Sequence, residues 1–375
     1  ISKNAFARDS SVTKVYLGSN LSAVAADAFF TKVSSGTMYI YGSTADTIAS
    51  LTGIKTNNSY TISKQPTWKD YGMHVAQYQV GAAAYAHVYQ TSTDEYLINI
   101  TGTGATYDNY TASSRPSWYS TYGKYTTELI VDSGITSIGN YLFYQHPELE
   151  TVTLPTTITK IGDYAFADCD NLKDTDFLTN TAAIGSGAFA NCDSLKSAFI
   201  PSMVKTLGGG IYSGSPVETI TYTAASANDL TSSVKPFAGV GGEEVETELN
   251  IEDNVPYIPA YMLLEATVDT VNVGAGVEDI GEAGFSGSAT ATVTVDSSNT
   301  NFKNAENGDI YSADGLTFVT YLGSHEDEFF TVPDVTGTTI AAGAFYGQPY
   351  VTQVSFNSAV IAIGDNAFAG CKKLS

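Results

Sequence analysis

Three cysteines and four histidines are the residues of this sequence best suited to chemistry. Cys169 lies in the stretch KIGDYAFADCDNL (160–172) among three aspartates, a setting that suits a thiolate nucleophile or a metal ligand: Asp163, Asp168 and Asp170. No serine has glycine at both −2 and +2, so the nucleophile elbow of the α/β-hydrolases is absent. The histidines show neither the H-E-x-x-H spacing nor a C-x-x-C companion, so we expect no metal and no cofactor: His74, His87, His146 and His325.

The stretch around Cys169 belongs to a repeat, which changes its meaning. Related stretches are TAAIGSGAFANCDSL and VIAIGDNAFAGCKKL. We call the large residue before the cysteine the anchor. Anchors recur at a constant spacing of 23 in several runs: Phe143, Phe166, Phe189 and Tyr212; Met262 and Phe285; Phe345 and Phe368; Phe6 and Phe29. One interval that returns this often indicates a repeat architecture.

The position three residues after the anchor, which we call the slot, is where all three cysteines lie. Cys169, Cys192 and Cys371 occupy it, while Ser288, Gly214 and Gln348 stand at or near it in other repeats. A catalytic residue would not be copied from repeat to repeat, so we expect buried, inert thiols and no catalytic residue. A disulfide between Cys169 and Cys192 on adjacent repeats is the alternative.

A second pattern, apolar-x-x-apolar-x-apolar, opens six residues after most anchors. After Phe143 it reads Leu149, Val152 and Leu154, and Pro155 follows. Its last positions alternate with polar residues, as in a strand with one buried face. An Ile-Gly pair precedes each Phe by four or five residues, and its glycine permits either a positive φ or a close approach between coils. A single repeat unit of this length cannot bury its own apolar face. Stacked units can, so the sequence predicts a helix-poor, mainly β solenoid with a parallel sheet along one side.

Composition excludes several classes of partner. The 375 residues include 39 acidic and 17 basic side chains, a net charge of −22, so we expect no nucleic acid or anionic membrane as the main partner. No apolar run approaches the ~20 residues that span a bilayer, so we expect no membrane insertion. The abundance of Thr, Ser, Asn, Tyr and Gly favours an extracellular β-rich protein. Because the sequence begins and ends inside a repeat, we expect it to be part of a longer polypeptide.

The motif L-x-x-V-x-L-P followed by I-x-x-I-G-x-x-A-F-x-x-C resembles the BspA-like, or Treponema-type, leucine-rich repeat, and LETVTLPTTITKIGDYAFADC matches it closely. Matching repeats cover about 128–222, 249–375 and 1–42. Residues 37–55 and 97–143 resemble the segments that close and open a repeat block in this family. The resemblance implies a non-catalytic bacterial surface protein that adheres to host or microbial proteins.

The domain organisation expected from these features has four parts. Residues 1–55 would end a first repeat block, 56–75 would form a junction, and 76–127 would cap a second block that fills 128–375. The stretch 223–248 is irregular. Asn307-Gly308 and Asp314-Gly315 are hairpin turn signals, so we expect a β-hairpin inserted at about 296–330.

The outward positions of the sheet form the candidate binding face, on which threonine is common. The candidates are Thr151, Thr153, Asp174, Asp176, Phe199, Thr219, Thr221, Asp269, Asn272 and Gln353. Phe199 is the one large apolar residue among the outward positions. It is either an exposed hot spot or is partly covered by a loop.

Two other features leave alternatives open. An aromatic platform for a sugar ring could be formed by Trp118, Tyr119 and Tyr122. Alternatively Trp118, like Trp68, plugs the end of a repeat block. The acidic stretches 241–253 and 324–330 could bind calcium but lack EF-hand spacing, so solvated loops are the other interpretation. The sequence therefore favours an adhesive scaffold for an extracellular protein, with a glycan-binding module and a structural stalk as rivals.

Overall fold

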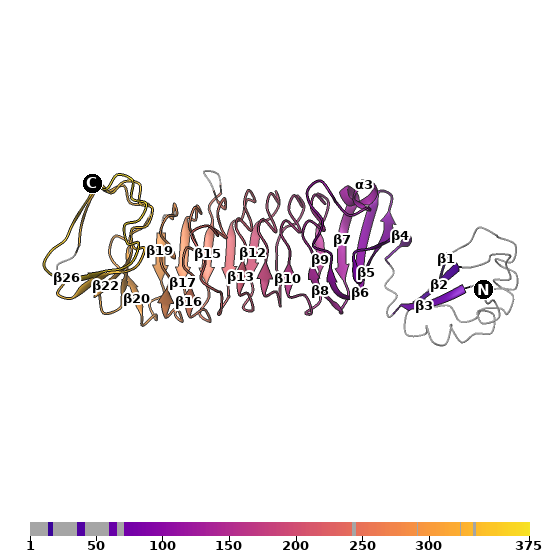
Figure 1. The fold of residues 1–375 in the computed structure, drawn as a ribbon, viewed down its shortest axis with the longest axis horizontal. Helices are drawn as coiled ribbons and strands as arrows, with labels where there is room; N and C mark the ends of the chain where they lie inside the picture. The colour runs from indigo at the N-terminus through magenta and orange to yellow at the C-terminus, as the bar shows by residue number, and fades with distance from the viewer. Residues whose placement is uncertain are drawn as a thin grey trace. The chain divides into compact units, whose positions relative to one another are not determined.

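The computed structural model describes three strands near the N-terminus, then residues 71–241, 245–290, 292–322, 324–332 and 335–375 (Figure 1). The chain divides into two compact units, Ile1–Gly72 and Met73–Ser375. In the first unit β1 (Lys14–Leu17), β2 (Gly36–Tyr41) and β3 (Tyr60–Gln65) form a parallel sheet. Val15 pairs with Met38, so β1 and β2 keep the spacing of the repeat, whereas Met38 pairs with Ile62, one position farther along. Phe6, Phe29 and Trp68 lie outside the described residues, and the boundaries expected at 55, 75 and 127 remain predictions.

The second unit opens with a cap of long strands. β4 (Met73–Gln79), β5 (Gly81–Ser92) and β6 (Glu95–Thr106) are antiparallel neighbours. A short helix α3 (Tyr119–Tyr122) and a 3₁₀ turn η1 (Gly123–Tyr125) lead to β7 (Thr126–Val131), which pairs in parallel with β6. β6 and β7 pair in parallel, as the strands of the solenoid do. The cap therefore supplies the first strand on which the coils stack.

The coils carry two rows of parallel strands. One row follows the alternating pattern: β9 (Thr151–Thr153) pairs with β7, and farther along lie β12 (Ser197–Ile200), β14 (Thr219–Tyr222), β15 (Glu248–Ile251), β17 (Thr270–Val273) and β19 (Thr292–Val295). The other row follows the Ile-Gly pairs: β8 (Ile135–Ile138), β10 (Lys160–Ile161), β11 (Ala183–Ile184) and β13 (Thr206–Leu207), then β16 (Tyr257–Ile258) with β18 (Asp279–Ile280). The parallel solenoid is confirmed. The second row of strands was not predicted from the sequence, because all of its strands except β8 have only two residues and so show no alternation.

The core is a ladder of stacked rings. Phe143, Phe166 and Phe189 are fully buried, with 5.5 Å between successive ring centroids. Tyr212 continues the stack at 5.7 Å, and Phe345 and Phe368 form a second run at 4.8 Å. Backbone bonds follow the same repeat, since Phe143 donates its N–H to Ala165 O at 2.9 Å. Each coil therefore completes the core of the one before it.

The Ile-Gly glycines are required by the approach of neighbouring coils. A Cβ on Gly162 would lie 2.5 Å from the backbone nitrogen of Asn140, and one on Gly185 would lie 2.5 Å from that of Asp163. Neither glycine has a positive φ. Of the two explanations offered by the sequence, close approach between coils is the one that the structure supports.

The anchor of one coil is Leu263, not Met262 as the repeat spacing predicts. Residues two before and two after an anchor have positive φ, as Tyr164 and Asp168 do around Phe166. In the coil assigned to Met262 the matching pair is Tyr261 and Glu265, which flank Leu263. Leu263 also donates its N–H to Gly284 O, as Phe143 does to Ala165 O. The interval from the anchor to Phe285 is therefore one position shorter than the repeat predicts.

The predicted hairpin insertion is present between the anchors Phe285 and Phe345. β20 (Phe302–Asn304), β21 (Ile310–Ser312) and β22 (Thr317–Thr320) are antiparallel neighbours, with positive φ at Gly308 and Gly315. β22 then pairs in parallel with β24 (Thr338–Ile340), which pairs with β26 (Val360–Ile363). Ser286 Oγ donates to Ala344 O at 3.2 Å, so the coils of Phe285 and Phe345 contact each other directly despite the residues inserted between them.

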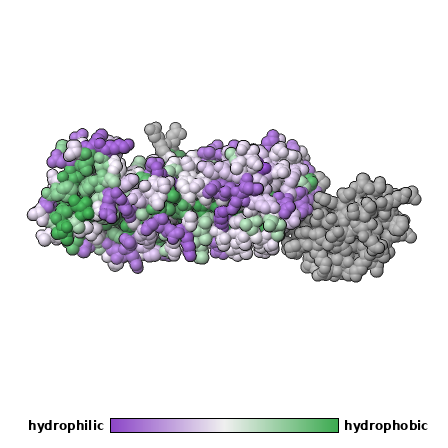
Figure 2. Space-filling view, viewed as in Figure 1, coloured by the Kyte–Doolittle hydropathy of each residue, from purple (hydrophilic) through white to green (hydrophobic). Residues whose placement is uncertain are grey.

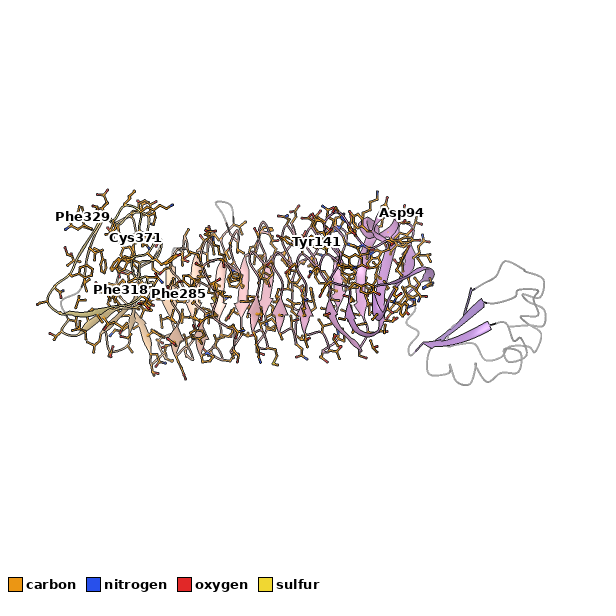
Figure 3. The ribbon with its side chains drawn as sticks, in the orientation of Figure 1. Asp94, Tyr141, Phe285, Phe318, Phe329 and Cys371 are labelled. Carbon is orange, nitrogen blue, oxygen red and sulfur yellow. The ribbon has the colours of Figure 1, made fainter. Side chains whose placement is uncertain are left out.

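The last coils expose apolar side chains. β23 (Phe329–Thr331) and β25 (Gln353–Ser355) form a separate two-stranded sheet. Figure 2 shows hydrophobic surface gathered over these C-terminal coils. Its exposed members include Phe329, Phe356, Ile361 and Ile363, and Figure 3 shows Phe329 and Cys371 at this end.

Candidate functional site

The cysteines lie in the slot, where they complete a ladder of hydrogen-bond donors. Cys169 Sγ donates to Phe143 O at 3.4 Å, and Cys192 Sγ donates to Phe166 O at 3.3 Å. In the next coil Ser215 Oγ does the same to Phe189 O at 2.8 Å. The slot of that coil is thus Ser215 rather than Gly214, which has a positive φ one position earlier.

In several coils the slot residue donates a hydrogen bond to a carbonyl of the preceding coil, and the sequence interpretation missed this. The coil of Leu263 is an exception, because its slot holds Ala266. Cys371 Sγ donates to Phe345 O, and Gln348 Nε2 donates to Tyr321 O and Leu322 O. Ser288 Oγ instead donates to Phe285 O within its own coil. The signal was available in the sequence, because Cys, Ser and Gln share a polar hydrogen. A carbonyl left unpaired inside the solenoid would destabilise it.

The environment of the thiols does not activate them. Burial raises the pKa of Cys169 well above the usual thiol value and that of Cys192 to about 12. Both side chains are free thiols and are fully buried, and Cys371 is a free thiol that is half-buried. A buried protonated thiol is a poor nucleophile and a poor metal ligand.

The aspartates of the opening stretch bridge coils at the surface. Asp168 accepts hydrogen bonds from Gln145 Nε2 and Asn191 Nδ2, each at 3.0 Å. Asp163 Oδ1 accepts the N–H of Ser186 at 2.8 Å. Their partners lie one repeat away, so these carboxylates tie one coil to the next.

Trp118 closes the end of the ring ladder and does not offer a sugar platform. Its side chain is fully buried, with its ring 6.2 Å from Phe143, and its Nε1 donates to His146 Nε2 at 3.2 Å. Tyr122 packs on Tyr96 at 4.9 Å, and the guanidinium of Arg115 covers the ring of Tyr119 at 4.3 Å. A platform formed by Trp118, Tyr119 and Tyr122 is therefore inconsistent with this structure, because a buried indole has no face for a ligand.

His146 occupies the slot of the first coil and is held neutral. It is fully buried, and burial lowers its pKa to about 4. Because Nε2 accepts from Trp118, the ring proton lies on Nδ1, which is 3.3 Å from Tyr144 O. His146 is thus part of the junction between cap and solenoid.

Most candidate residues of the binding face do lie outward, but they do not share one sheet. Thr219, Thr221 and Asn272 project from β14 and β17, and Asp269 immediately precedes β17. Phe199 on β12 is half-buried, which favours partial cover over a fully exposed hot spot. Other candidates lie elsewhere: Thr151 and Thr153 are exposed on β9, and Gln353 is exposed on β25 in the separate small sheet.

Asp174 and Asp176 are exposed, but the expected strand is missing there. Only an isolated bridge from Asp174 to Ser197 remains. The inward position between them holds Thr175, whose Oγ1 accepts the N–H of Phe199 at 2.8 Å. A buried hydroxyl replaces the apolar residue that the alternation requires, and this interrupts the row between β9 and β12.

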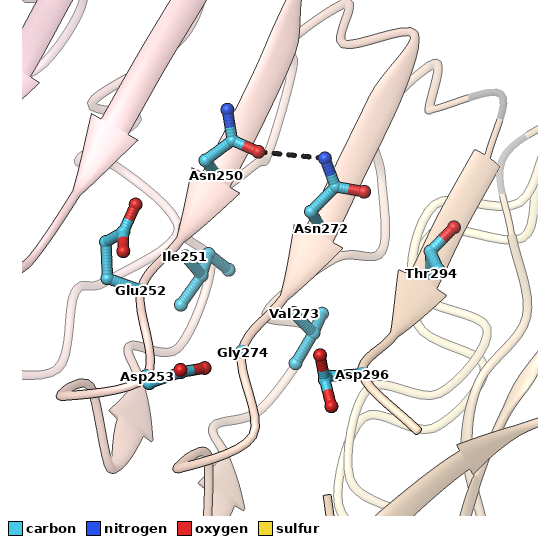
Figure 4. Close-up of a pocket in the computed structure, with 9 residues that line it drawn as sticks. All are labelled: Asn250, Ile251, Glu252, Asp253, Asn272, Val273, Gly274, Thr294 and Asp296. Atoms are coloured by element: carbon cyan, nitrogen blue, oxygen red, sulfur yellow. Dashed lines mark hydrogen bonds between the residues drawn. The ribbon is translucent and has the colours of Figure 1, made fainter. Parts of the chain in front are cut away.

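The continuous part of the face is the five-stranded sheet β12-β14-β15-β17-β19, which ends in a hollow. The hollow has a volume of about 280 Å³ and lies beside the C-terminal ends of β15, β17 and β19 (Figure 4). Amides form one wall, where Asn272 Nδ2 donates to Asn250 Oδ1 at 2.8 Å. Carboxylates form the other wall, and the floor lies at Gly274: the acidic residues are Glu252, Asp253 and Asp296.

Comparisons with known proteins agree with this architecture. The family profile described as BspA type leucine rich repeat region matches in six copies, over residues 118–234, 246–330 and 338–375. Among curated proteins, none matches the chain. In the described residues, no helix has the length and apolar character needed to cross a membrane.

Solved structures of bacterial repeat proteins are similar to parts of the chain. A leucine-rich repeat protein from Eubacterium ventriosum is 21% identical, covers 80% of this chain and 71% of its own, and has a TM-score of 0.39. A leucine rich cell surface protein from Faecalibacterium prausnitzii is 20% identical, with coverages of 80% and 82% and the same TM-score. The pneumococcal vaccine antigen PcpA is 16% identical, with coverages of 80% and 70% and a TM-score of 0.39.

Proposed function

Since the chain belongs to the BspA-type leucine-rich repeat family, we propose that it acts outside the cell as an adhesive scaffold, binding a host or microbial surface protein through the sheet β12-β14-β15-β17-β19. Repeats of this family form protein-interaction scaffolds. No catalytic step is assigned to the chain: Cys169 and Cys192 are buried and protonated, and Cys371 donates to a carbonyl of the preceding coil.

The observation that carries the proposal is the outer face of this sheet. Its strands pair in unbroken parallel register from Ser197 to Val295, while their outward side chains remain half-buried or exposed. A regular face of short polar side chains loses little conformational entropy when a partner covers it. Five adjacent strands, at ~4.8 Å each, extend this face over about 20 Å along the solenoid.

The test is binding of the purified chain to immobilised extracellular matrix proteins and to whole microbial cells. Thr219→Lys with Thr221→Lys places two long charged side chains on the face and should abolish specific binding. Thr179→Lys with Ser202→Lys adds the same charge at exposed positions outside the strands and should leave binding intact. Equal losses in both variants would show that the face is not the binding surface.

The rivals predict different results in the same assay. Binding to a glycan array without binding to any protein would favour a carbohydrate module, although the buried Trp118 weakens that interpretation. Retained adhesion of a longer polypeptide after both substitutions on the face would favour a stalk that displays other domains.

A further inference from the structure

The charge of the sheet face changes along the solenoid. Nearer the cap, acidic side chains beside the sheet are paired with lysines of a neighbouring coil, as Glu150 is with Lys173 and Glu218 with Lys196. From Pro236 to Phe302 the sequence has twelve acidic residues and no Lys, Arg or His. Within the described residues, the carboxylates of Glu252, Asp253 and Asp296 form no ion pair. This part of the face has no cation of its own, so a basic partner would complement its charge.

The hollow gives that charge a defined shape. Ile251, Val273 and Val295 are register partners across β15, β17 and β19, so the next residues along the three strands are Glu252, Gly274 and Asp296. Two strand spacings place the two acidic positions about 10 Å apart across the gap left by Gly274. Figure 4 shows Asp253 and Asp296 on either side of Gly274.

The gap is fixed by the backbone. A Cβ on Gly274 would lie 2.7 Å from Ile251 O and 2.8 Å from the carbonyl carbon of Glu252, so no side chain fits there without displacement of the coil. Asp253 Oδ1 accepts the N–H of Ala275 at 2.8 Å and holds the same turn in place. The close approach of the coils therefore excludes a side chain at the position between Glu252 and Asp296.

The arrangement does not suit a metal ion. Calcium needs six to eight oxygen ligands that converge on one point. Among the described residues, no three His, Cys, Asp or Glu side chains lie close enough together to hold a metal. Separated carboxylates beside a row of amides fit a ligand whose positive charges are also separated.

We propose that the face of β15, β17 and β19 docks an extended protein segment that carries arginine or lysine, with one such side chain entering the hollow over Gly274 between Glu252 and Asp296. This inference rests on the proposed scaffold function and names the chemistry of its partner. The amides of Asn250 and Asn272 line the other wall, where they can hydrogen-bond the backbone of the segment. A volume of about 280 Å³ accommodates one long basic side chain.

The experiment measures binding of a labelled peptide of alternating arginine and serine to the full chain by fluorescence anisotropy. The same peptide with citrulline in place of arginine keeps the shape and removes the charge. Glu252→Gln with Asp296→Asn should weaken arginine-peptide binding by about tenfold at ~0.15 M salt. The side-chain oxygen that remains after Asp296→Asn can still accept the Ser298 N–H that Asp296 Oδ1 accepts now, so the turn is preserved.

The matched control is Glu278→Gln with Asp279→Asn. These two residues are exposed beside the other strand row, within the same acidic stretch, and their substitution removes the same charge. The control should leave affinity within about twofold of the parent chain. Equal losses in both double variants would overturn the proposal, since binding would then follow net charge alone. Equal affinity for the citrulline peptide, or saturable calcium binding that displaces the arginine peptide, would overturn it as well.

A separate result distinguishes this inference from the scaffold function. If Thr219→Lys with Thr221→Lys abolishes binding to a surface protein, but Glu252→Gln with Asp296→Asn leaves that binding unchanged and the arginine peptide does not bind, the scaffold stands and the basic-segment proposal fails. If no surface protein binds, but the arginine peptide binds and Glu252→Gln with Asp296→Asn weakens that binding, the hollow binds basic segments and the scaffold function fails.

Discussion

Phe166 and Phe189 lie one coil apart with their ring centroids 5.5 Å apart and their planes within 4° of parallel. Both rings are fully buried, and the backbone follows them, since Phe166 donates its N–H to Ala188 O at 2.9 Å. Ring stacking and interstrand hydrogen bonding therefore share one repeat. A substitution that removes one ring therefore disturbs the packing of the coil on each side.

Phe166→Ala should destabilise the second unit by about 3–5 kcal/mol, because the lost ring leaves a cavity that the flanking coils cannot fill. The measurement is guanidinium unfolding followed by circular dichroism. Tyr164→Ala is the control, since Tyr164 is 38% exposed in the same turn and should cost less. A loss below about 1 kcal/mol for Phe166→Ala would contradict the ring ladder as the main core.

Cys192→Ser should retain stability better than Cys192→Ala. Serine can donate to Phe166 O as Ser215 donates to Phe189 O, whereas alanine leaves that buried carbonyl unpaired at a cost of about 1–3 kcal/mol. Thermal unfolding of the two variants decides between them. Neither should alter partner binding, because the slot faces the core. Equal stability would show that the slot selects for volume only.

Thiol reagents should distinguish the three cysteines. Cys371 is half-buried and should react first, while Cys169 and Cys192 should react only on unfolding, because burial raises the pKa of both. Timed labelling at pH 8 followed by mass spectrometry of peptides measures the order. Rapid modification of Cys169 in the folded chain would argue against its place in the core.

Acid should loosen the junction between the cap and the solenoid through His146. Its folded pKa of about 4 lies below the ordinary 6.5, so between these values the unfolded chain binds a proton that the folded chain does not. The contribution of neutral His146 to the free energy of unfolding is therefore complete above pH 6.5. It falls by about 3 kcal/mol as the pH drops to 4. His146→Gln keeps an acceptor for Trp118 and should remove this part of the slope. Identical pH profiles for parent and variant between pH 6.5 and 5 would refute the assignment.

In LGGGIY (207–212), Gly208 is required by close approach between coils, whereas Gly209 is not. A Cβ on Gly208 would overlap the backbone nitrogen of Ser186, whereas a Cβ on Gly209 would meet nothing nearer than 3.8 Å. Gly208→Ala should therefore destabilise the chain by more than about 2 kcal/mol, and Gly209→Ala should be neutral or raise stability by up to about 1 kcal/mol. Paired denaturation curves test the difference, and a reversed order would mean that the coils are farther apart than described.

The sequence predicted the repeat, the parallel solenoid and the inserted hairpin, because each follows from local periodicity or turn chemistry. It misassigned the anchor at Leu263, since adjacent Met262 is equally apolar and the interval shortens by one position there. The polar hydrogen that Cys, Ser and Gln share is a sequence signal for the donor role of the slot, but its acceptors, Phe143 O and Phe166 O, are identified only by the structure. The loss of strand at Thr175 depends on which residue faces inward, and one irregular position does not reveal that.

The hollow was not predictable for a different reason. It depends on the register of three strands, on a glycine between two acidic positions and on the absence of lysines from neighbouring coils. Asn272 and Asp269 were recognised as outward residues, but Glu252 and Asp296 follow their strands and fall outside the alternating pattern. Only pairing across coils places them on one edge.

The unequal coil lengths also determine how the second unit would respond to mechanical load. The spacing from Phe143 to Tyr212 is constant, whereas the interval from Leu263 to Phe285 is one position shorter, and each coil packs against its two neighbours. A coil pulled from the stack would release roughly 75–90 Å of extended chain, compared with the ~4.8 Å that it occupies when folded. Such a protein would lengthen stepwise under tension and dissipate work at each step. Under the proposed scaffold function, this extensibility would be as useful as affinity.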